Sequence, residues 1–343
     1  MALKDVPGQP RAKLFLGKLF ESTQVPHALL FSGMEGIGKS AVALQFAKLL
    51  NCLAPVEHDC CDRCTACLKM ENGTHPDLLW VKADGAFIKL DQIRGLRNRL
   101  RFSPFEGNRR VIVIENGQSL REEAANALLK MLEEPPGRNV LLVTTLEPQM
   151  LLPTIVSRCC HIRFQPIDVE ALAGLLAAQH PMTSLKALKV ARLAEGSITR
   201  GRWLCDENRV DQWKETLKKV ESLGDLGILE FFPLMAQWVQ KSENLEQDLE
   251  CIKLWMRDVI LCRLLENHQP LFELDRSTLR AAGRTGTDTL FSIYEQIEQA
   301  LHRLRQNANK NLVFEGVCLA IKDSLYGKGR WDSISQRRES LSF

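Results

Sequence analysis

The chain of 343 residues has few of the features that mark secreted, membrane-spanning or strongly basic proteins. Its net charge is only +3, which produces no field that would by itself draw the whole chain to nucleic acid. No apolar run approaches the roughly 18 residues of a membrane span, so we expect no membrane partner. Residues 1–10 lack the apolar core of a signal peptide. We therefore expect a cytoplasmic protein.

Cysteine, by contrast, is plentiful, with 11 residues. Because cytoplasmic thiols stay reduced, metal ligands and buried core residues explain these cysteines better than disulfides do. The remaining composition, 45% hydrophobic and 25% charged, is ordinary for a folded protein. The length suggests two or three domains.

The most specific motif lies at residues 33–40, which read GMEGIGKS. It fits G-x-x-x-x-G-K-[ST], a loop whose backbone N–H groups cradle nucleotide phosphates. A short apolar run precedes the motif and a helical pattern follows it, as in a strand–loop–helix phosphate site. In this loop glycines allow the tight turn, the lysine reaches the outer phosphates and the serine holds Mg²⁺. The residues concerned are Gly33, Gly36, Gly38, Lys39 and Ser40.

Beyond the helical pattern, four cysteines follow the spacing C-x8-C-x2-C-x2-C. This spacing suits a closed, tetrahedral four-thiolate zinc site with a structural role. The expected ligands are Cys52, Cys61, Cys64 and Cys67, with Cys60 as the alternative to its neighbour. An iron–sulfur cluster is the alternative metal, but the C-x3-C-P continuation of the ferredoxin pattern is missing.

A fully apolar run at 110–114 predicts a central strand that ends in Glu115-Asn116. P-loop ATPases normally carry an Asp there, which holds Mg²⁺, and often a Glu that orients the attacking water. The Glu115 carboxylate is one methylene longer, and the Asn116 amide cannot accept a proton. We expect metal binding by Glu115 to be feasible and hydrolysis to be inefficient.

Strand and helix patterns then alternate to about residue 166, including a helix that a capping box from Ser119 to Glu122 is predicted to open. This alternation after a P-loop predicts a parallel α/β sheet with nucleotide at the carboxyl ends of its strands. From about residue 207 the pattern is all-helical, and apolar residues at 245–259 follow a 3.6-residue period.

Several short motifs together resemble the AAA+ module of bacterial DNA polymerase III clamp loaders over residues 1–166. Besides the P-loop and the cysteines, they are Gly8-Gln9, Pro26-His27-Ala28, Thr74-His75-Pro76-Asp77, Ala125–Lys130, Glu133–Pro136 and Ser157-Arg158-Cys159. Within this family the sequence is most similar to the non-motor δ′ type. The resemblance implies a non-polymerising holoenzyme subunit in a ring with γ/τ and δ-like subunits. That ring loads a sliding clamp onto primer–template DNA.

The resemblance also implies roles for individual residues. Arg158 matches the family's arginine finger, which acts in trans on the ATP of a neighbouring subunit. Thr144 and Thr145 lie where the family places its sensor-1 polar residue. Thr199 stands where motor subunits carry the sensor-2 arginine. Arg200 comes one residue later, about 100° around a helix, so we assign it no phosphate contact.

The expected organisation has three parts. Residues 1–166 form the AAA+ domain with its zinc module at 52–67, residues 167–206 a helical lid, and residues 207–343 an all-α collar with a flexible tail. The expected ligands are structural Zn²⁺ and ATP with Mg²⁺. The alternative function is an ATP-hydrolysing γ/τ-type motor subunit. An unrelated P-loop enzyme, such as a small-molecule kinase, leaves the cysteines and the helical half unexplained.

Overall fold

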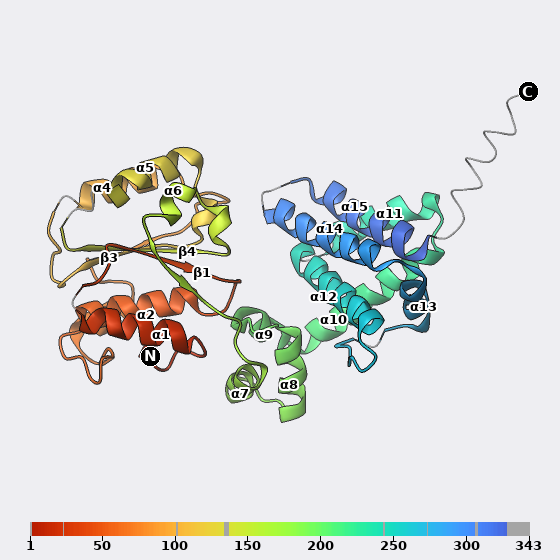
Figure 1. The fold of residues 1–343 in the computed structure, drawn as a ribbon, viewed down its shortest axis with the longest axis horizontal. Helices are drawn as coiled ribbons and strands as arrows, with labels where there is room; N and C mark the ends of the chain where they lie inside the picture. Colours follow the sequence, from red (N-terminus) through yellow and green to blue (C-terminus); the bar gives the residue numbers. More distant parts are fainter. Residues whose placement is uncertain are drawn as a thin grey trace, which may run out of the picture. The chain divides into compact units, whose positions relative to one another are not determined.

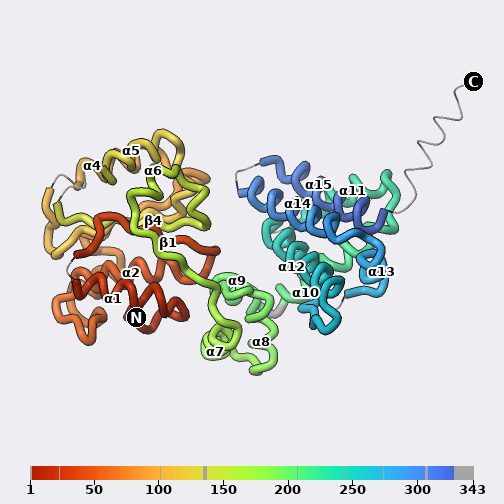
Figure 2. The backbone as a smooth tube through the Cα atoms, in the orientation of Figure 1, coloured from red at the N-terminus to blue at the C-terminus, as the bar shows by residue number. Residues whose placement is uncertain are grey.

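The computed structural model describes residues 2–22, 24–100, 102–133, 137–242, 244–272, 274–305 and 308–327. The chain divides into two compact units, Met1–Cys205 and Asp206–Phe343, which Figures 1 and 2 draw from red to green and from green to blue. Within the described ranges, no helix combines the length and the apolar character needed to cross a membrane. The finer three-part organisation stays a prediction.

The first unit is built on a five-stranded parallel sheet in the order β2-β3-β4-β1-β5. Its strands are β1 (Ala28–Ser32), β2 (Leu78–Val81), β3 (Arg110–Ile114), β4 (Asn139–Thr145) and β5 (Cys160–Arg163). The three central strands, β3, β4 and β1, are buried along their whole length, as continuous apolar runs require. The predicted parallel α/β fold is confirmed.

Helices cover both faces of this sheet (Figure 1). On one face lie α1 (Pro10–Glu21) and α2 (Lys39–Asn51), and on the other α4 (Leu90–Leu100), α5 (Glu122–Glu133) and α6 (Pro153–Val156). Alternate β1 residues serve the two cores, with Leu29 in the core of the first face and Leu30 in that of the second. The sheet is thereby covered on both sides, and its carboxyl edge is left to the loops.

Helix α5 corrects one prediction. It begins at Glu122, three residues after the expected cap, because Ser119 ends a short 3₁₀ turn (Gly117–Ser119). Leu120 is then extended and bridges Ile88, which keeps it out of the helix. The predicted stop at Glu133–Pro136 is met by the helix end at Glu133, and its other residues lie outside the described ranges.

Three further helices complete the first unit: α7 (Val169–Gln179), α8 (Ser184–Leu193) and α9 (Ile198–Leu204). The start of α9 is joined to the P-loop through the main chain, because the N–H of Ile198 donates to the carbonyl of Gly36 at 2.8 Å. Gly196 has φ of +83°, and a Cβ there would lie 2.6 Å from the backbone nitrogen of Ile167. Backbone contacts and close packing at glycine therefore hold the start of α9 against the P-loop and against residues 166–167.

The second unit is all-helical, as predicted. Its helices are α10 (Glu207–Glu221), α11 (Ile228–Lys241), α12 (Leu245–Leu264), α13 (Arg276–Arg284), α14 (Thr287–Arg305) and α15 (Lys310–Ala320), which a π turn (Ile321–Tyr326) follows. The largest side chains of its core are aromatic, and they include Trp213, Trp255, Phe231 and Phe314. The tail predicted to be flexible lies outside the described residues.

Candidate nucleotide site and cysteine cluster

The P-loop joins β1 to α2 and has the strained backbone that its glycines permit. Gly33, Gly36 and Gly38 have φ values of +144°, +76° and +97°, a region that favours glycine. A Cβ at Gly36 would lie 2.2 Å from the hydroxyl oxygen of Ser197. The N–H of Gly33 donates to the carbonyls of Thr145 and Leu146 at the end of β4. The loop is thus fixed by both the sheet and α9.

Lys39 lies inside the curve of the loop. Its ammonium group donates to the carbonyls of Gly33 and Met34, the latter at 2.7 Å, and the residue is only 7% exposed. Burial lowers the pKa of Lys39 to about 8, although nearby Glu35 and Glu115 pull it upward. The charge that would bind phosphate is therefore sensitive to pH near neutrality.

Glu115 is held by three groups from two segments, the start of α2 and the end of β2. One carboxylate oxygen accepts the Ser40 hydroxyl at 2.6 Å, and the other accepts the indole N–H of Trp80 at 3.0 Å. The Lys82 ammonium lies 3.2 Å from that second oxygen. Burial raises the pKa of Glu115, but the hydrogen bonds of Ser40, Trp80 and Lys82 outweigh it, so the pKa lies below its usual range. Glu115 is consequently an ionised carboxylate that contacts three donor groups.

Thr144 lies at the end of β4, beside the end of β3. Its buried hydroxyl oxygen accepts the N–H of Asn116 at 3.0 Å. Asn116 has φ of +56°, and it lines the cavity over the P-loop. Thr144 therefore supports the residue that replaces the usual hydrolytic carboxylate.

A cavity of about 430 Å³ opens over the loop. Its walls come from three parts of the first unit: residues 5–7, the P-loop with the end of β3, and helices α7 and α9. Arg202 also lines it, and its guanidinium donates to the Gln179 side chain at 3.0 Å. Sequence reasoning missed Arg202, which shares a helical face with Thr199 at i+3. Arg200 instead pairs with Glu195 at 3.1 Å.

The cysteine cluster lies beyond the end of α2. The sulfurs of Cys52, Cys61, Cys64 and Cys67 all lie within 4.8 Å of one another. Backbone N–H groups donate to three of them, at 3.3 to 3.5 Å. Chiefly through a hydrogen bond from the Arg63 N–H, the pKa of Cys61 is lowered to about 6, which favours the thiolate. This donor set fits a tetrahedral thiophilic ion such as Zn²⁺.

Cys60 has different surroundings. Its thiol lies near the side-chain oxygens of Gln45 and Asp62, at 3.9 and 3.6 Å, and burial raises its pKa to about 12. The same region contains the buried Lys48 ammonium, which pairs with Asp62 and with Glu71. The geometry therefore favours Cys61 over Cys60 as the ligand.

Arg158 lies between α6 and β5, two residues before the strand begins. Its guanidinium is 2.9 Å from a Glu133 carboxylate oxygen and donates to the Thr154 carbonyl at 3.1 Å. The side chain is 37% exposed. Since the strands are parallel, Arg158 lies at their amino edge, across the sheet from the P-loop at the carboxyl edge.

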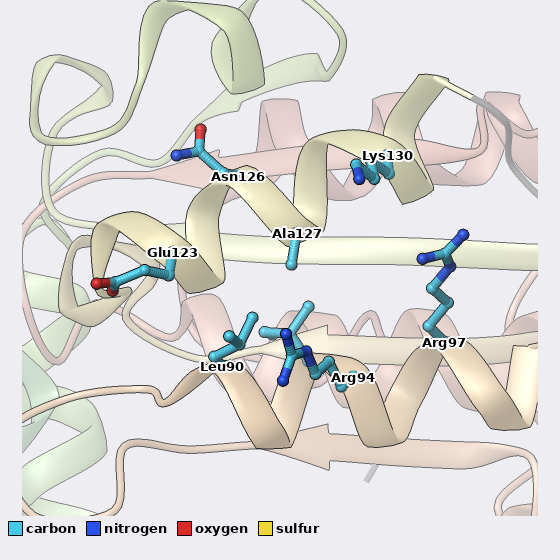
Figure 3. Close-up of a pocket in the computed structure, with 8 residues that line it drawn as sticks. Leu90, Arg94, Arg97, Glu123, Asn126, Ala127 and Lys130 are labelled. Atoms are coloured by element: carbon cyan, nitrogen blue, oxygen red, sulfur yellow. The ribbon is translucent and has the colours of Figure 1, made fainter.

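A second cavity of about 420 Å³ lies between α4 and α5. Figure 3 shows the side chains of Arg94 and Arg97 extending from α4 and that of Lys130 from α5. Glu123 also lines it, so three cations stand against one anion. The charged side chains around this cavity are therefore mainly cationic.

Comparisons with known proteins match this chain to subunits of DNA polymerase III. The family model described as "DNA polymerase III, delta subunit" matches residues 8–168. DNA polymerase III subunit delta' of Bacillus subtilis is 30% identical over 92% of this chain and 96% of its own length. Its Pseudomonas aeruginosa counterpart is 31% identical over 84% and 89%. DNA polymerase III subunit tau of Escherichia coli is 35% identical over 59% of this chain but only 32% of its own length.

Proposed function

The chain belongs to the DNA polymerase III subunit delta' family, and from this premise we propose that it is the non-motor δ′ subunit of a clamp loader. In this role it joins γ/τ- and δ-type subunits in a hetero-oligomeric ring. The ring uses ATP to place a sliding clamp on primer–template DNA. The contribution of this chain to ATP turnover is the Arg158 guanidinium.

The position of Arg158 carries this proposal. It is separated from its own P-loop by the length of β5, four residues or roughly 13 Å of strand. A guanidinium at that edge is out of reach of a nucleotide in its own chain, yet its partial exposure leaves it accessible to a neighbour. On a neighbour's ATP it would stabilise the charge that develops on the transferred phosphate.

The chain's own P-loop is suited to holding ATP rather than hydrolysing it. Asn116 cannot act as a base toward water, and both oxygens of Glu115 already accept hydrogen bonds. The Lys82 ammonium further neutralises this carboxylate. Glu115, beside Ser40, would help to hold Mg²⁺, while hydrolysis at this site would be inefficient.

Zinc in the four-cysteine cluster would have a structural role. Four protein ligands fill its tetrahedral shell and leave no position for a substrate. When bound, the ion crosslinks the end of α2 to the segment that leads into α3 (Thr65–Glu71).

Reconstitution with motor and δ-type subunits tests the proposal. Steady-state ATP turnover of the complex, with clamp and primed DNA present, is compared for wild type, Arg158→Ala and Lys39→Ala. We expect Arg158→Ala to slow turnover at least tenfold, a lower bound set beneath the roughly 10³- to 10⁵-fold effect of arginine fingers. Lys39→Ala should change it less than twofold. Circular dichroism should show both variants folded; Arg158 makes only an exposed ion pair and an exposed hydrogen bond, which contribute little to stability.

The γ/τ-type alternative predicts the opposite pattern. A purified wild-type chain that hydrolyses ATP at motor-subunit rates, and loses that activity with Lys39→Ala, would exclude the δ′ role. Equal ATP turnover by wild-type and Arg158→Ala complexes would show that Arg158 does not act as an arginine finger.

A further inference from the structure

The amino-terminal residues form one wall of the nucleotide cavity. Asp5, Val6 and Pro7 line it together with residues of helices α7 and α9. Val6 is buried, and one of its methyl carbons would lie 3.6 Å from a Cβ at Gly38. The position of this segment therefore determines the shape of the cavity beside the phosphate loop.

Asp59 holds this segment in place from far along the sequence. Its two carboxylate oxygens accept the backbone N–H groups of Leu3 and Lys4, each at 2.9 Å. Asp59 is buried at 7% exposure, and Leu3 at 4%. Hydrogen bonds to a carboxylate are stronger than neutral ones and gain further where water is excluded. Asp59 is thus an anchor for the start of the chain.

Asp59 itself belongs to the loop that the cysteine cluster closes. It lies between Cys52 and Cys61, and it pairs with Val56 through two backbone hydrogen bonds of 2.9 Å. One of its side-chain oxygens also accepts the N–H of Cys60 at 2.7 Å. A metal ion shared by Cys52 and Cys61 would restrain both ends of this loop, because metal binding orders the segment that supplies its ligands.

We propose that Asp59 is a positioning residue that couples metal occupancy of the cysteine cluster to nucleotide affinity at the P-loop. The coupling runs from the metal to the 52–61 loop, from Asp59 to residues 3–4, and from there to the cavity wall at residues 5–7. This coupling rests on the proposed function, because it requires zinc in the cysteine cluster and nucleotide in the cavity.

Lys13 supports the segment from its other side. Its ammonium donates to the carbonyls of Lys4 and Val6, at 3.1 and 2.8 Å. This contact comes from α1 and does not involve the cysteine loop. Loss of the metal should therefore shift and loosen the wall without releasing the whole segment.

Coupling between two sites is reciprocal. If zinc strengthens nucleotide binding by a given factor, nucleotide must strengthen zinc binding by the same factor. Reciprocity holds for coupling by any mechanism, including coupling through overall stability. A positioning role is therefore distinguished by loss of the coupling in an Asp59 variant that stays folded and retains zinc.

The first experiment measures binding of a fluorescent ATP analogue to the full chain, zinc-loaded and chelator-stripped. In wild type, zinc removal should weaken binding at least about fivefold, the lower end of typical coupling between sites. Asp59→Asn should bind weakly and equally in both states. Glu71→Gln is the matched control, because Glu71 contacts Lys48 beside the cluster. It should keep the wild-type ratio. Zinc release to a colorimetric chelator should slow with nucleotide in wild type and in Glu71→Gln, but not in Asp59→Asn.

The second experiment does not require nucleotide. Amide hydrogen exchange of peptides covering residues 2–9 should rise on zinc removal and in zinc-loaded Asp59→Asn, but not in Glu71→Gln. Unchanged exchange on zinc removal would overturn the inference. So would wild-type coupling in Asp59→Asn, or failure of that variant to retain zinc, since Asp59 would then help to build the cluster. If zinc protects residues 2–9 from exchange but the chain binds no nucleotide, the proposed nucleotide site is refuted and the link from the cluster to residues 2–9 is not.

Discussion

Lys39 differs from a lysine in solvent because burial inside the P-loop makes its charge costly. With its pKa lowered to about 8, it is mainly protonated at pH 7 and mainly neutral at pH 9. Phosphate needs the protonated form. We expect ATP affinity to fall roughly tenfold from pH 7 to pH 9, the change in charged fraction for a group of this pKa.

The matched control is Lys39→Arg, because arginine stays charged throughout this range. Binding of a fluorescent ATP analogue, measured in one buffer series at constant ionic strength, should be nearly independent of pH for the variant. A wild-type profile as flat as that of Lys39→Arg would show that Lys39 is not the titrating group.

At the residue scale, the sequence predicted the identity of the loop residues but not the partners of Glu115. Trp80 and Lys82 come from the end of β2, which is adjacent to β3 only because of the strand order. A motif records neither strand order nor register, so these contacts were invisible to it. Arg202 was missed for a similar reason, since its access to the cavity depends on how α9 packs on the loop.

At the scale of elements, the cysteine module offers a direct test with an internal control. Because four sulfurs converge and Cys60 lies apart, Cys61→Ser should lose bound zinc while Cys60→Ser retains about one ion per chain. Metal content by inductively coupled plasma mass spectrometry, after purification without chelator, is the measurement. Equal retention by both variants would contradict the assignment of Cys61.

Helices α4 and α5 lead to another prediction. If Arg94 and Arg97 contact DNA phosphates in the assembled loader, Arg94→Ala/Arg97→Ala should reduce the slope of log affinity against log salt by about two. Fluorescence anisotropy with primed DNA measures this slope. Arg11→Ala, an exposed change on α1 at the opposite face of the sheet, is the control. If the double variant leaves the slope unchanged, Arg94 and Arg97 do not contact DNA phosphates.

Element types were predictable because strand and helix have distinct apolar periods, and the central apolar runs of the first unit leave little ambiguity. Element boundaries were less so. Ser119 and Glu122 carry a valid capping pattern, yet the bridge between Ile88 and Leu120 delays the helix. That bridge joins segments about thirty residues apart, so a local pattern could not predict it.

At the scale of the whole molecule, each of the two units has its own core, and this should be visible in unfolding. We expect two transitions in calorimetry. Nucleotide at a hundredfold excess over its dissociation constant should stabilise only the first unit, by about 2.7 kcal/mol. Tryptophan fluorescence helps the assignment, because Trp213, Trp238 and Trp255 are buried in the second unit. A single transition that shifts as a whole would show that the units unfold together.

The contact between Ile198 and Gly36 also bears on how this protein can change over evolutionary time. Both partners use main-chain atoms. Neither Gly36, which accepts the bond, nor Gly196, two residues before Ile198, has room for a side chain. Most interfaces change gradually through side-chain substitutions. Such substitutions can hardly alter this main-chain contact. We therefore expect substitutions that alter the activity of the first unit to occur in α7 and α9. The main-chain contact between Ile198 and Gly36 should stay the same.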